Sequence, residues 1–494
     1  MDACLPLKPS DSLVAEITQL YVIEEWSLKR MRSSRSTPRK TVDQWKAFLK
    51  RHGITKNLCW EEVSKIKGEK GSAVNNWTSL VLADGLLLDN MDIAQHYKRG
   101  QRYRRTPQKR EARNITYVDL PFRLTILQDP EVFKSFRRFL FYTRLHFETS
   151  FERGIWAPNP QGLYARSMDL RLRLSELSEV HNKIVDALEQ FRAGRSERGW
   201  AIVRDSFKVH GNLVGSNHHR QFPDLLAILL LLQRGGHGPI SRHMVENLLA
   251  WSQSILKPND PRRILFQCLP RLSLDPHGHL YQSFDSYCRR LWQVNARCDE
   301  IRAYVSYNQA SFPRADIGEF YNLFEGKPIE QIYETLHTAD IELGDASHET
   351  FTLWHTAVRS LGRDGRYGDM TNVVRSLCTR IYPLAATFGH HEHRQLNLDS
   401  ALSFFLLGGA EEILGDLHDA RLSFQEAIKI RSWNIPFEKN DHAKAAALRR
   451  LLSIALKLGD LSAAKDCNRW LDRMYSEVEL RDKEEREKAS RISL

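Results

Sequence analysis

A short motif recurs in the carboxy-terminal third of the chain and limits its fold more than any other feature. Leu414-Gly-Asp-Leu-x-x-Ala420 returns as Leu458-Gly-Asp-Leu-x-x-Ala464, 44 residues later. A looser copy, Tyr367-Gly-Asp-Met-x-x-Val373, precedes the first by 47 residues. Apolar segments with helical spacing flank each copy, so each motif is interpreted as the tight turn between two helices. We therefore expect stacked helix pairs through residues 331–477.

The middle copy also resembles the tetratricopeptide repeat. The residues in register with that pattern are small or apolar: Phe404, Leu407, Gly408, Gly415, Ala420, Phe424 and Ala427. Glu411 departs from it, since an aromatic residue is usual there. The resemblance implies stacked helices whose extended surface binds a protein partner, as helical repeats commonly do.

The rest of the chain is predicted to be helical as well. No stretch alternates apolar and polar residues as a half-buried strand does, so no sheet is expected and the fold class is all-α. Asp129-Pro130 predicts the start of a helix that runs to about Phe151. The expected divisions are a small amino-terminal domain (8–58), a basic linker (59–115), a helical middle region (116–330), tetratricopeptide-like repeats (331–477) and a charged tail (478–494).

Positive charge is concentrated near the amino terminus. Residues 1–114 hold 22 Lys/Arg against 13 Asp/Glu, whereas the remaining 380 residues hold 50 against 48. Between Lys29 and Lys56 there are ten Lys/Arg and one acid, Asp43. Such a surface favours polyanions, because each basic group on a phosphate releases condensed counterions. The other interpretation is a solvated helix face that only aids solubility.

The same stretch has the outline of three short helices. Apolar residues at helical spacing predict a first helix near Leu13–Tyr21, Ser27 is placed to cap a second, and Thr41 to cap a third. In the third helix Val42, Trp45 and Leu49 share one face, and the opposite face is polar and basic. Three short helices with a basic last one are typical of a helix-turn-helix DNA-binding domain.

Two segments here are similar to a known family. They are Ile17-x-x-Leu20-Tyr21-x-x-Glu24-x-x-Ser27-Leu28-Lys29 and Trp45-Lys46-x-x-Leu49-Lys50-x-x-Gly53-Ile54-x-Lys56-Asn57. They resemble the amino-terminal domain of fungal cryptic loci regulator proteins, which implies a helix-turn-helix or Myb-like DNA-binding module ahead of a helical region. The expected contacts to double-stranded DNA are Arg39, Lys40, Gln44, Lys46, Lys50, Arg51 and Lys56.

A second basic cluster follows in the expected linker. Its members form two groups separated by Thr106-Pro107-Gln108: Lys98, Arg99, Arg102, Arg104 and Arg105, then Lys109 and Arg110. This arrangement suits a nuclear import signal, the alternative being a solvated linker helix. Seven scattered cysteines without any C-x-x-C pair argue for a reducing compartment. The predicted location is the nucleus.

Other chemistry finds little support in the residues. His390, His391 and His393 around Glu392, and likewise His218-His219, could suggest a metal site. The first cluster falls at a junction between repeats, where charged loops are common, so no metal is expected. No nucleophile or phosphate-binding motif is evident, which predicts no enzyme activity, no cofactor and no small-molecule substrate. The apolar run Leu225–Leu232 is too short to cross a bilayer and is expected to be a buried helix.

Together these patterns predict a nuclear, DNA-binding regulator of transcription or chromatin. The amino-terminal domain is expected to contact DNA and the helical repeats to bind an unidentified protein partner. The alternative is a helical-repeat scaffold for protein interactions that lacks sequence-specific DNA binding.

Overall fold

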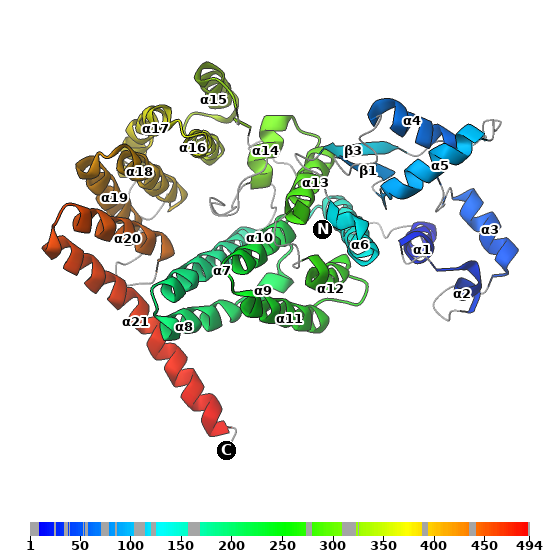
Figure 1. The fold of residues 1–494 in the computed structure, drawn as a ribbon, viewed down its shortest axis with the longest axis horizontal. Helices are drawn as coiled ribbons and strands as arrows, with labels where there is room; N and C mark the ends of the chain where they lie inside the picture. Colours follow the sequence, from blue (N-terminus) through cyan, green and yellow to red (C-terminus); the bar gives the residue numbers. More distant parts are fainter. Residues whose placement is uncertain are drawn as a thin grey trace. The chain divides into compact units, whose positions relative to one another are not determined.

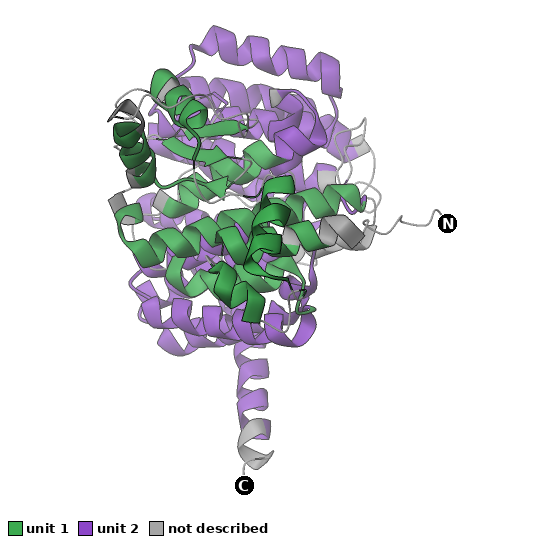
Figure 2. Ribbon diagram, turned by 90° about the vertical axis from the view of Figure 1, so that its right-hand side faces the viewer, with its two compact units in different colours: residues 1–153, 257–291 green, residues 154–256, 292–494 purple. Residues whose placement is uncertain are grey.

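The protein is mostly α-helical in a computed structural model, which divides into two compact units (Figures 1 and 2). Unit 1 comprises residues 1–153 and 257–291, and unit 2 comprises 154–256 and 292–494. The structure describes residues 9–23, 26–33, 38, 40–52, 54, 58–70, 79–83, 86–102, 114–119, 125–156, 168–272, 279–308, 323–324, 326–387, 394–433 and 441–492.

Unit 1 begins with a small group of helices around its own apolar core. The elements are α1 (Pro9–Thr18), the π-helix η1 (Gln19–Ile23), α2 (Leu28–Ser33) and α3 (Val42–Arg51). Their buried residues are Ile17, Met31, Trp45 and Leu49. The three helices expected from the sequence are therefore present, and we call residues 9–54 the amino-terminal module.

A three-stranded antiparallel sheet follows, where the sequence predicted a linker without strands. The elements are α4 (Trp60–Lys70), β1 (Ser79–Ala83), β2 (Leu86–Leu87), α5 (Asn90–Arg102) and β3 (Ile115–Asp119). The central strand is β1, with Leu82 opposite Leu87 of β2 and Leu80 opposite Val118 of β3. The expectation of no sheet is wrong because every residue of β1 is buried, which removes the alternation that marks a strand in a sequence.

The core of this sheet packs against α4 and α5, through Val63, Ile66 and Ile93. Further helices complete unit 1. They are η3 (Thr125–Gln128), α6 (Pro130–Glu152), α12 (Pro261–Leu272) and α13 (His279–Ala296), the last within the unit as far as residue 291. The predicted helix start is confirmed: Asp129 caps α6 by accepting from Glu131 N at 2.8 Å, and Pro130 opens the helix. The rings of Phe139 and Phe284 pack at 4.5 Å, which joins α6 to α13.

The described part of unit 2 starts with six helices and includes a buried polar cluster. The helices are α7 (Met168–Arg192), α8 (Ser196–Phe207), α9 (His210–Gly215), α10 (Gln221–Arg234), α11 (Gly238–Ile255) and α14 (Glu300–Asn308). Arg220 is wholly buried, donates to Asp224 Oδ1 and Asn308 Oδ1 at 3.0 Å each, and lies 4.5 Å from the ring of Tyr307. This cluster joins the start of α10 to the end of α14. The apolar run Leu225–Leu232 lies buried in α10, as predicted. No helix among the described residues has the length and apolar character that a membrane crossing needs.

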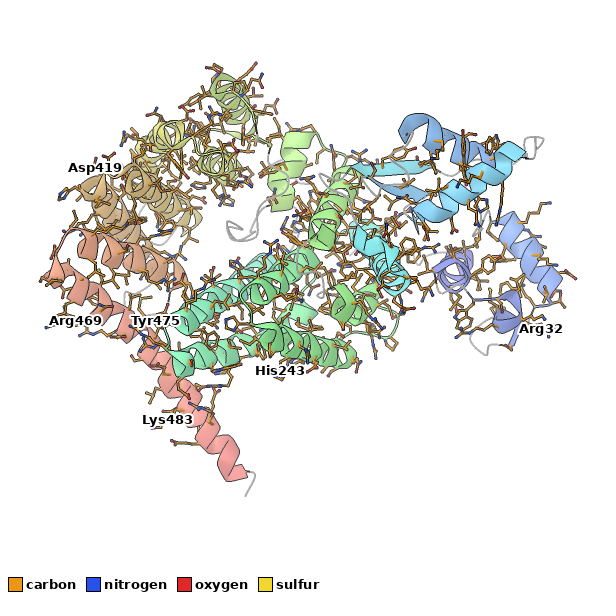
Figure 3. All side chains as sticks on the ribbon, in the orientation of Figure 1. Arg32, His243, Asp419, Arg469, Tyr475 and Lys483 are labelled. Carbon is orange, nitrogen blue, oxygen red and sulfur yellow. The ribbon has the colours of Figure 1, made fainter. Side chains whose placement is uncertain are left out.

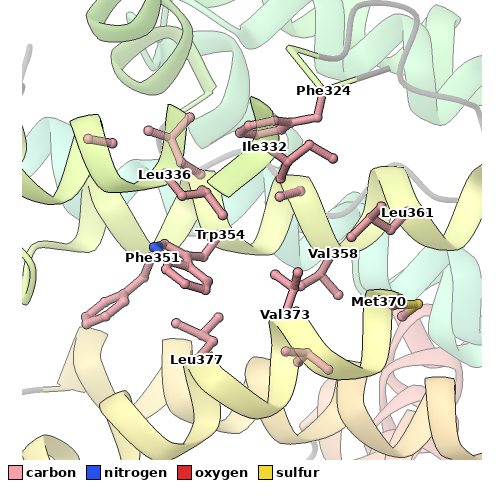
Figure 4. Close-up of a cluster of buried hydrophobic side chains, with 14 of the residues drawn as sticks. Phe324, Ile332, Leu336, Phe351, Trp354, Val358, Leu361, Met370, Val373 and Leu377 are labelled. Carbon is pink, nitrogen blue, oxygen red and sulfur yellow. The ribbon is translucent and has the colours of Figure 1, made fainter. Parts of the chain in front are cut away.

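The remaining helices of unit 2 pack in sequence order. They are α15 (Ile329–Leu343), α16 (His348–Arg363), α17 (Tyr367–Thr387), α18 (Arg394–Leu414), α19 (Leu417–Ser432), α20 (His442–Lys457) and α21 (Leu461–Ile492). A continuous core runs between α15, α16 and α17, with Leu336, Phe351, Val358 and Val373 wholly or almost wholly buried (Figure 4). The segment predicted as a charged tail forms the second half of α21 as far as Ile492.

Three helix pairs in this region share the same turn. A glycine with positive φ follows the first helix of each pair: Gly365 (+71°), Gly415 (+91°) and Gly459 (+72°). Glycine adopts this conformation without the steric penalty that a Cβ would introduce. The turn of the first pair lies three residues earlier than the sequence predicted, because Gly368 is inside the first turn of α17.

The buried residues of these pairs keep the same distance from the turn glycine. Met370, Ala420 and Ala464 each lie five residues beyond it, with at most 7% of the residue exposed. In α18, a Cβ built on Gly408 would lie 3.1 Å from the ring of Phe424 of α19. The two helices therefore approach closely at the point where the motif places small residues.

The last helices of unit 2 also pack against its first ones. Asp186 of α7 is 1% exposed at its side chain and accepts from Arg449 of α20 at 2.9 Å, and it also pairs with His442. Burial alone raises the pKa of Asp186, but the two basic partners outweigh it and hold that pKa below its usual value. Buried charge is tolerated here because it is paired.

A row of ion pairs continues this contact between α8 and α21. Arg198 donates to Glu479 at 2.7 Å, Arg204 donates to Asp482 at 2.7 Å, and Lys208 pairs with Glu485 at 2.7 Å. The partners lie more than 270 residues apart in sequence. The packing of α21 therefore depends on ion pairs between residues that are far apart in sequence, which no local sequence pattern predicts.

Candidate nucleic-acid interface

The start of α3 is fixed by a reciprocal pair of hydrogen bonds. Thr41 Oγ1 accepts from Gln44 N at 3.2 Å, and Gln44 Oε1 accepts from Thr41 N at 2.8 Å. This capping box satisfies amide groups that the first turn of a helix leaves without intrahelical partners. The predicted cap at Thr41 is confirmed, and Gln44 has a structural role that the sequence analysis did not assign.

One face of α3 holds the helix on the amino-terminal module. Trp45 is fully buried and Leu49 is 6% exposed, in the same core as Ile17 and Met31. The ring of Trp45 meets that of Phe48 edge-on at 5.8 Å. Burying a large aromatic side chain contributes much of the stability of so small a core. The opposite face of α3 is thereby presented to solvent.

The exposed face carries most of the described residues that were predicted to contact DNA. Lys50 and Arg51 are exposed, and Lys46 is exposed but lies 3.2 Å from Asp43 Oδ1. The Lys46–Asp43 pair is weak because its side chains are 64% and 90% exposed. Lys40 is half-buried, with Nζ 5.9 Å from the centre of the Trp45 ring. Arg39 and Lys56 lie outside the described residues.

The adjacent helix α2 adds cations that were not among the predicted contacts. Lys29, Arg30 and Arg32 are exposed, and Arg32 lies at the end of this helix in Figure 3. The guanidinium carbon of Arg30 lies 4.2 Å from the centre of the Trp26 ring, which restricts that side chain. The dense run of basic residues in the sequence includes this helix and could have indicated that Lys29, Arg30 and Arg32 are candidate contacts.

The second basic cluster lies partly on a folded helix. Lys98 and Arg99 are exposed on α5, and Arg102 is in its last turn. Tyr97 of the same helix stacks on Trp60 of α4 with ring centres 5.6 Å apart. Arg104, Arg105, Lys109 and Arg110 lie outside the described residues. The first two residues of the predicted import signal are therefore presented on a packed helix.

The neighbouring histidines of unit 2 are part of its core. His218 and His219 are at most 3% exposed, and His219 Nε2 lies 2.7 Å from the backbone oxygen of Tyr307. Burial lowers the pKa of His219 to about 3, which keeps its ring neutral. Within the described residues, no three His, Cys, Asp or Glu side chains converge as metal ligands would. His390, His391 and His393 lie outside the described residues.

No protein-family model matches the chain, and no curated protein or solved structure is significantly similar to it. The resemblances to cryptic loci regulators and to tetratricopeptide repeats therefore stay predictions.

Proposed function

We propose that the protein is a nuclear, DNA-binding regulator of transcription or chromatin. The observation that supports this function best is the charge of the amino-terminal module. In the described part of residues 26–54, six Lys/Arg side chains are exposed on α2 and α3, and the one carboxylate is that of Asp43. A helix-turn-helix-like arrangement would place α3 against the duplex, as in the family that the sequence resembles.

Binding of this kind has a clear dependence on salt. Each cation placed on a phosphate releases condensed counterions, so the affinity falls steeply as salt rises. With six contacts, affinity should fall about 10³-fold between about 50 and 200 mM NaCl. A basic surface that only aids solubility would show no such salt-dependent binding to DNA.

The test is a titration of the full chain against a labelled duplex, measured by fluorescence anisotropy at several salt concentrations. Lys50→Ala with Arg51→Ala should weaken binding and reduce the slope of log K against log salt by about 1.8. Lys483→Ala with Lys488→Ala is the matched control, since it removes two exposed charges from α21. No binding by the parent at about 50 mM salt, or equal binding by the two double variants, contradicts the proposal.

The helical body is proposed to be a tetratricopeptide-like array that binds a protein partner. The shared turn glycines and the close contact of Gly408 with Phe424 support this assignment. Stacked repeats bury a continuous core and leave an extended surface for a partner. Ala420→Leu, which should overpack the contact between α18 and α19, tests the array by its effect on stability.

Nuclear residence is proposed from the basic cluster that includes Lys98 and Arg99. Both side chains are exposed on α5 and accessible to an import receptor. The full chain fused to a fluorescent protein should accumulate in nuclei, and Lys98→Ala with Arg99→Ala should reduce that accumulation. Unchanged nuclear signal in this variant would show that the two residues are not part of the import signal.

The alternative function is a helical-repeat scaffold without sequence-specific DNA binding. One observation favours it: Gln44, the uncharged residue among the expected DNA contacts, already accepts a hydrogen bond from Thr41. If the repeats alone carry the function and the basic module has no role on DNA, the duplex should stay free at every salt concentration in the anisotropy titration. A DNA-binding regulator should retain the duplex at low salt.

A further inference from the structure

The amino-terminal end of α3 is where a helix-turn-helix domain normally contacts bases. Recognition helices in this class touch base edges mainly with their first residues. In this protein the exposed side chains at that end are those of Thr41, Asp43, Gln44 and Lys46. Each of them already takes part in a hydrogen bond or an ion pair with another of these residues.

Gln44 is the only uncharged side chain on the exposed face of α3 that could form a pair of hydrogen bonds with a base. Recognition of adenine by glutamine uses both the amide oxygen and the amide nitrogen. The oxygen of Gln44 accepts from Thr41 N at 2.8 Å, so base recognition would require the capping box to open. Opening it would remove a stabilising cap from the helix that has to enter the groove.

Asp43 is also poorly suited to read bases. Its carboxylate lies 3.2 Å from Lys46 Nζ in a weak, exposed ion pair. An unpaired Asp43 carboxylate would be repelled by the phosphates on either side of the groove. The free cations of α3, Lys50 and Arg51, lie instead in its last turn.

The exposed cations are suited to phosphates. Three lie on α2 and three on α3, and the two helices share one core through Met31 and Trp45. Contacts from Lys and Arg to phosphates position a protein on a duplex but carry no sequence information. Among the described residues, the exposed cations supply charge for affinity, whereas the polar side chains of Thr41 and Gln44 at the start of α3 are already bonded to each other's backbone in the capping box.

We infer that the amino-terminal module binds the phosphate backbone of duplex DNA with little preference for base sequence, and that Gln44 is a helix-capping residue. This inference rests on the proposed DNA-binding function. It defines the ligand as duplex DNA of any sequence, so the choice of genomic site would be made by the protein partner of the helical body.

The first experiment is a binding-site selection on the full chain from a random duplex library, followed by anisotropy with A·T-rich, G·C-rich and mixed duplexes. We expect no enriched motif and affinities within about threefold of each other, because one base-reading contact discriminates by roughly fivefold or more. An enriched motif bound at least tenfold better than its scrambled version overturns the inference and leaves the proposed function intact. No binding to any duplex overturns both.

Two variants test the role of Gln44. Gln44→Ala should speed hydrogen exchange in α3 and change the affinity for all three duplexes by one common factor. Gln44→Glu keeps an acceptor for Thr41 N and should restore the protection of α3, again with unchanged ratios among the duplexes. A loss of preference for one duplex in Gln44→Ala, with α3 still protected as in the parent, would show that Gln44 contacts bases.

Discussion

Replacing Trp45 by alanine should open the amino-terminal module and leave the rest of the chain folded. Trp45 is wholly buried and is the largest side chain in a core whose other buried members are Ile17, Met31 and Leu49. Truncation of a buried Trp or Phe to alanine costs about 3–5 kcal/mol. Since the core is so small, few neighbouring side chains are available to collapse into the space that is left.

This cost predicts the size of the effect. A loss of about 3–5 kcal/mol in local stability corresponds to roughly a 200- to 5,000-fold larger open population. Whole domains are stable by only about 5–15 kcal/mol, so a module of this size should become largely open. The open state exposes the amide groups of α1, α2 and α3 together, because the three helices share one core.

Hydrogen exchange of the full chain, measured by mass spectrometry, reports this opening segment by segment. Peptides from α1 to α3 should exchange much faster in Trp45→Ala, while peptides from α18 and α19 should match the parent. Trp45→Phe is the control, because it keeps an aromatic ring in the core and should lose clearly less protection. Parent-like protection of α3 in Trp45→Ala would refute the view that this side chain holds the module together.

Three further changes test the body of the protein. Ala420→Leu should overpack the contact between α18 and α19 and lower the free energy of unfolding by about 1–3 kcal/mol. Asp419→Leu, on the exposed side of α19 (Figure 3), should change it by at most about 0.5 kcal/mol. Equal thermal midpoints for the two variants would contradict this. Burial disfavours the charged form of His348, but the Asp399 carboxylate at 2.7 Å outweighs burial and raises the pKa of His348 above 6.5. The pair should therefore stabilise the folded protein fully below pH 6.5, and this stabilisation should be lost as the pH rises through the pKa of the folded state. His348→Gln should therefore flatten the decrease in melting temperature between about pH 6 and 8, and an unchanged decrease would count against the pair. Arg204→Ala removes two hydrogen bonds to α21 and should lower stability by about 1–2 kcal/mol at low salt. The loss should be smaller at about 0.5 M NaCl, as measured by differential scanning fluorimetry. A loss of stability that does not depend on salt would mean that packing and not charge is responsible.

Several features of the fold could be predicted because they depend on neighbours in sequence. Thr41 and Asp129 mark helix starts, since a cap bonds to amides two or three residues further on. The turn at Gly415 was expected for a similar reason, because glycine adopts a positive φ at low cost. The burial of Trp45 followed from its place on the apolar face of a short helix.

The sequence could not predict features that depend on distant partners. The sheet of β1 to β3 was missed because β1 is covered on both faces, and its pairing with β3 joins segments more than 30 residues apart. The capping role of Gln44 was missed for a different reason. A polar residue at the start of a helix suits a capping box as well as a DNA contact, and only the geometry shows that Gln44 forms the capping box.

The sequence by itself determined the local structure of this protein: where its helices begin, where glycine turns separate them, and which module carries the surplus of positive charge. Tertiary structure alone decided which charges meet. Arg204 and Asp482 lie 278 positions apart, and Asp186 and Arg449 lie 263 apart, yet each pair is in contact. Local patterns follow from backbone geometry and hydrogen bonds over three or four residues, whereas such ion pairs follow from the packing of whole helices.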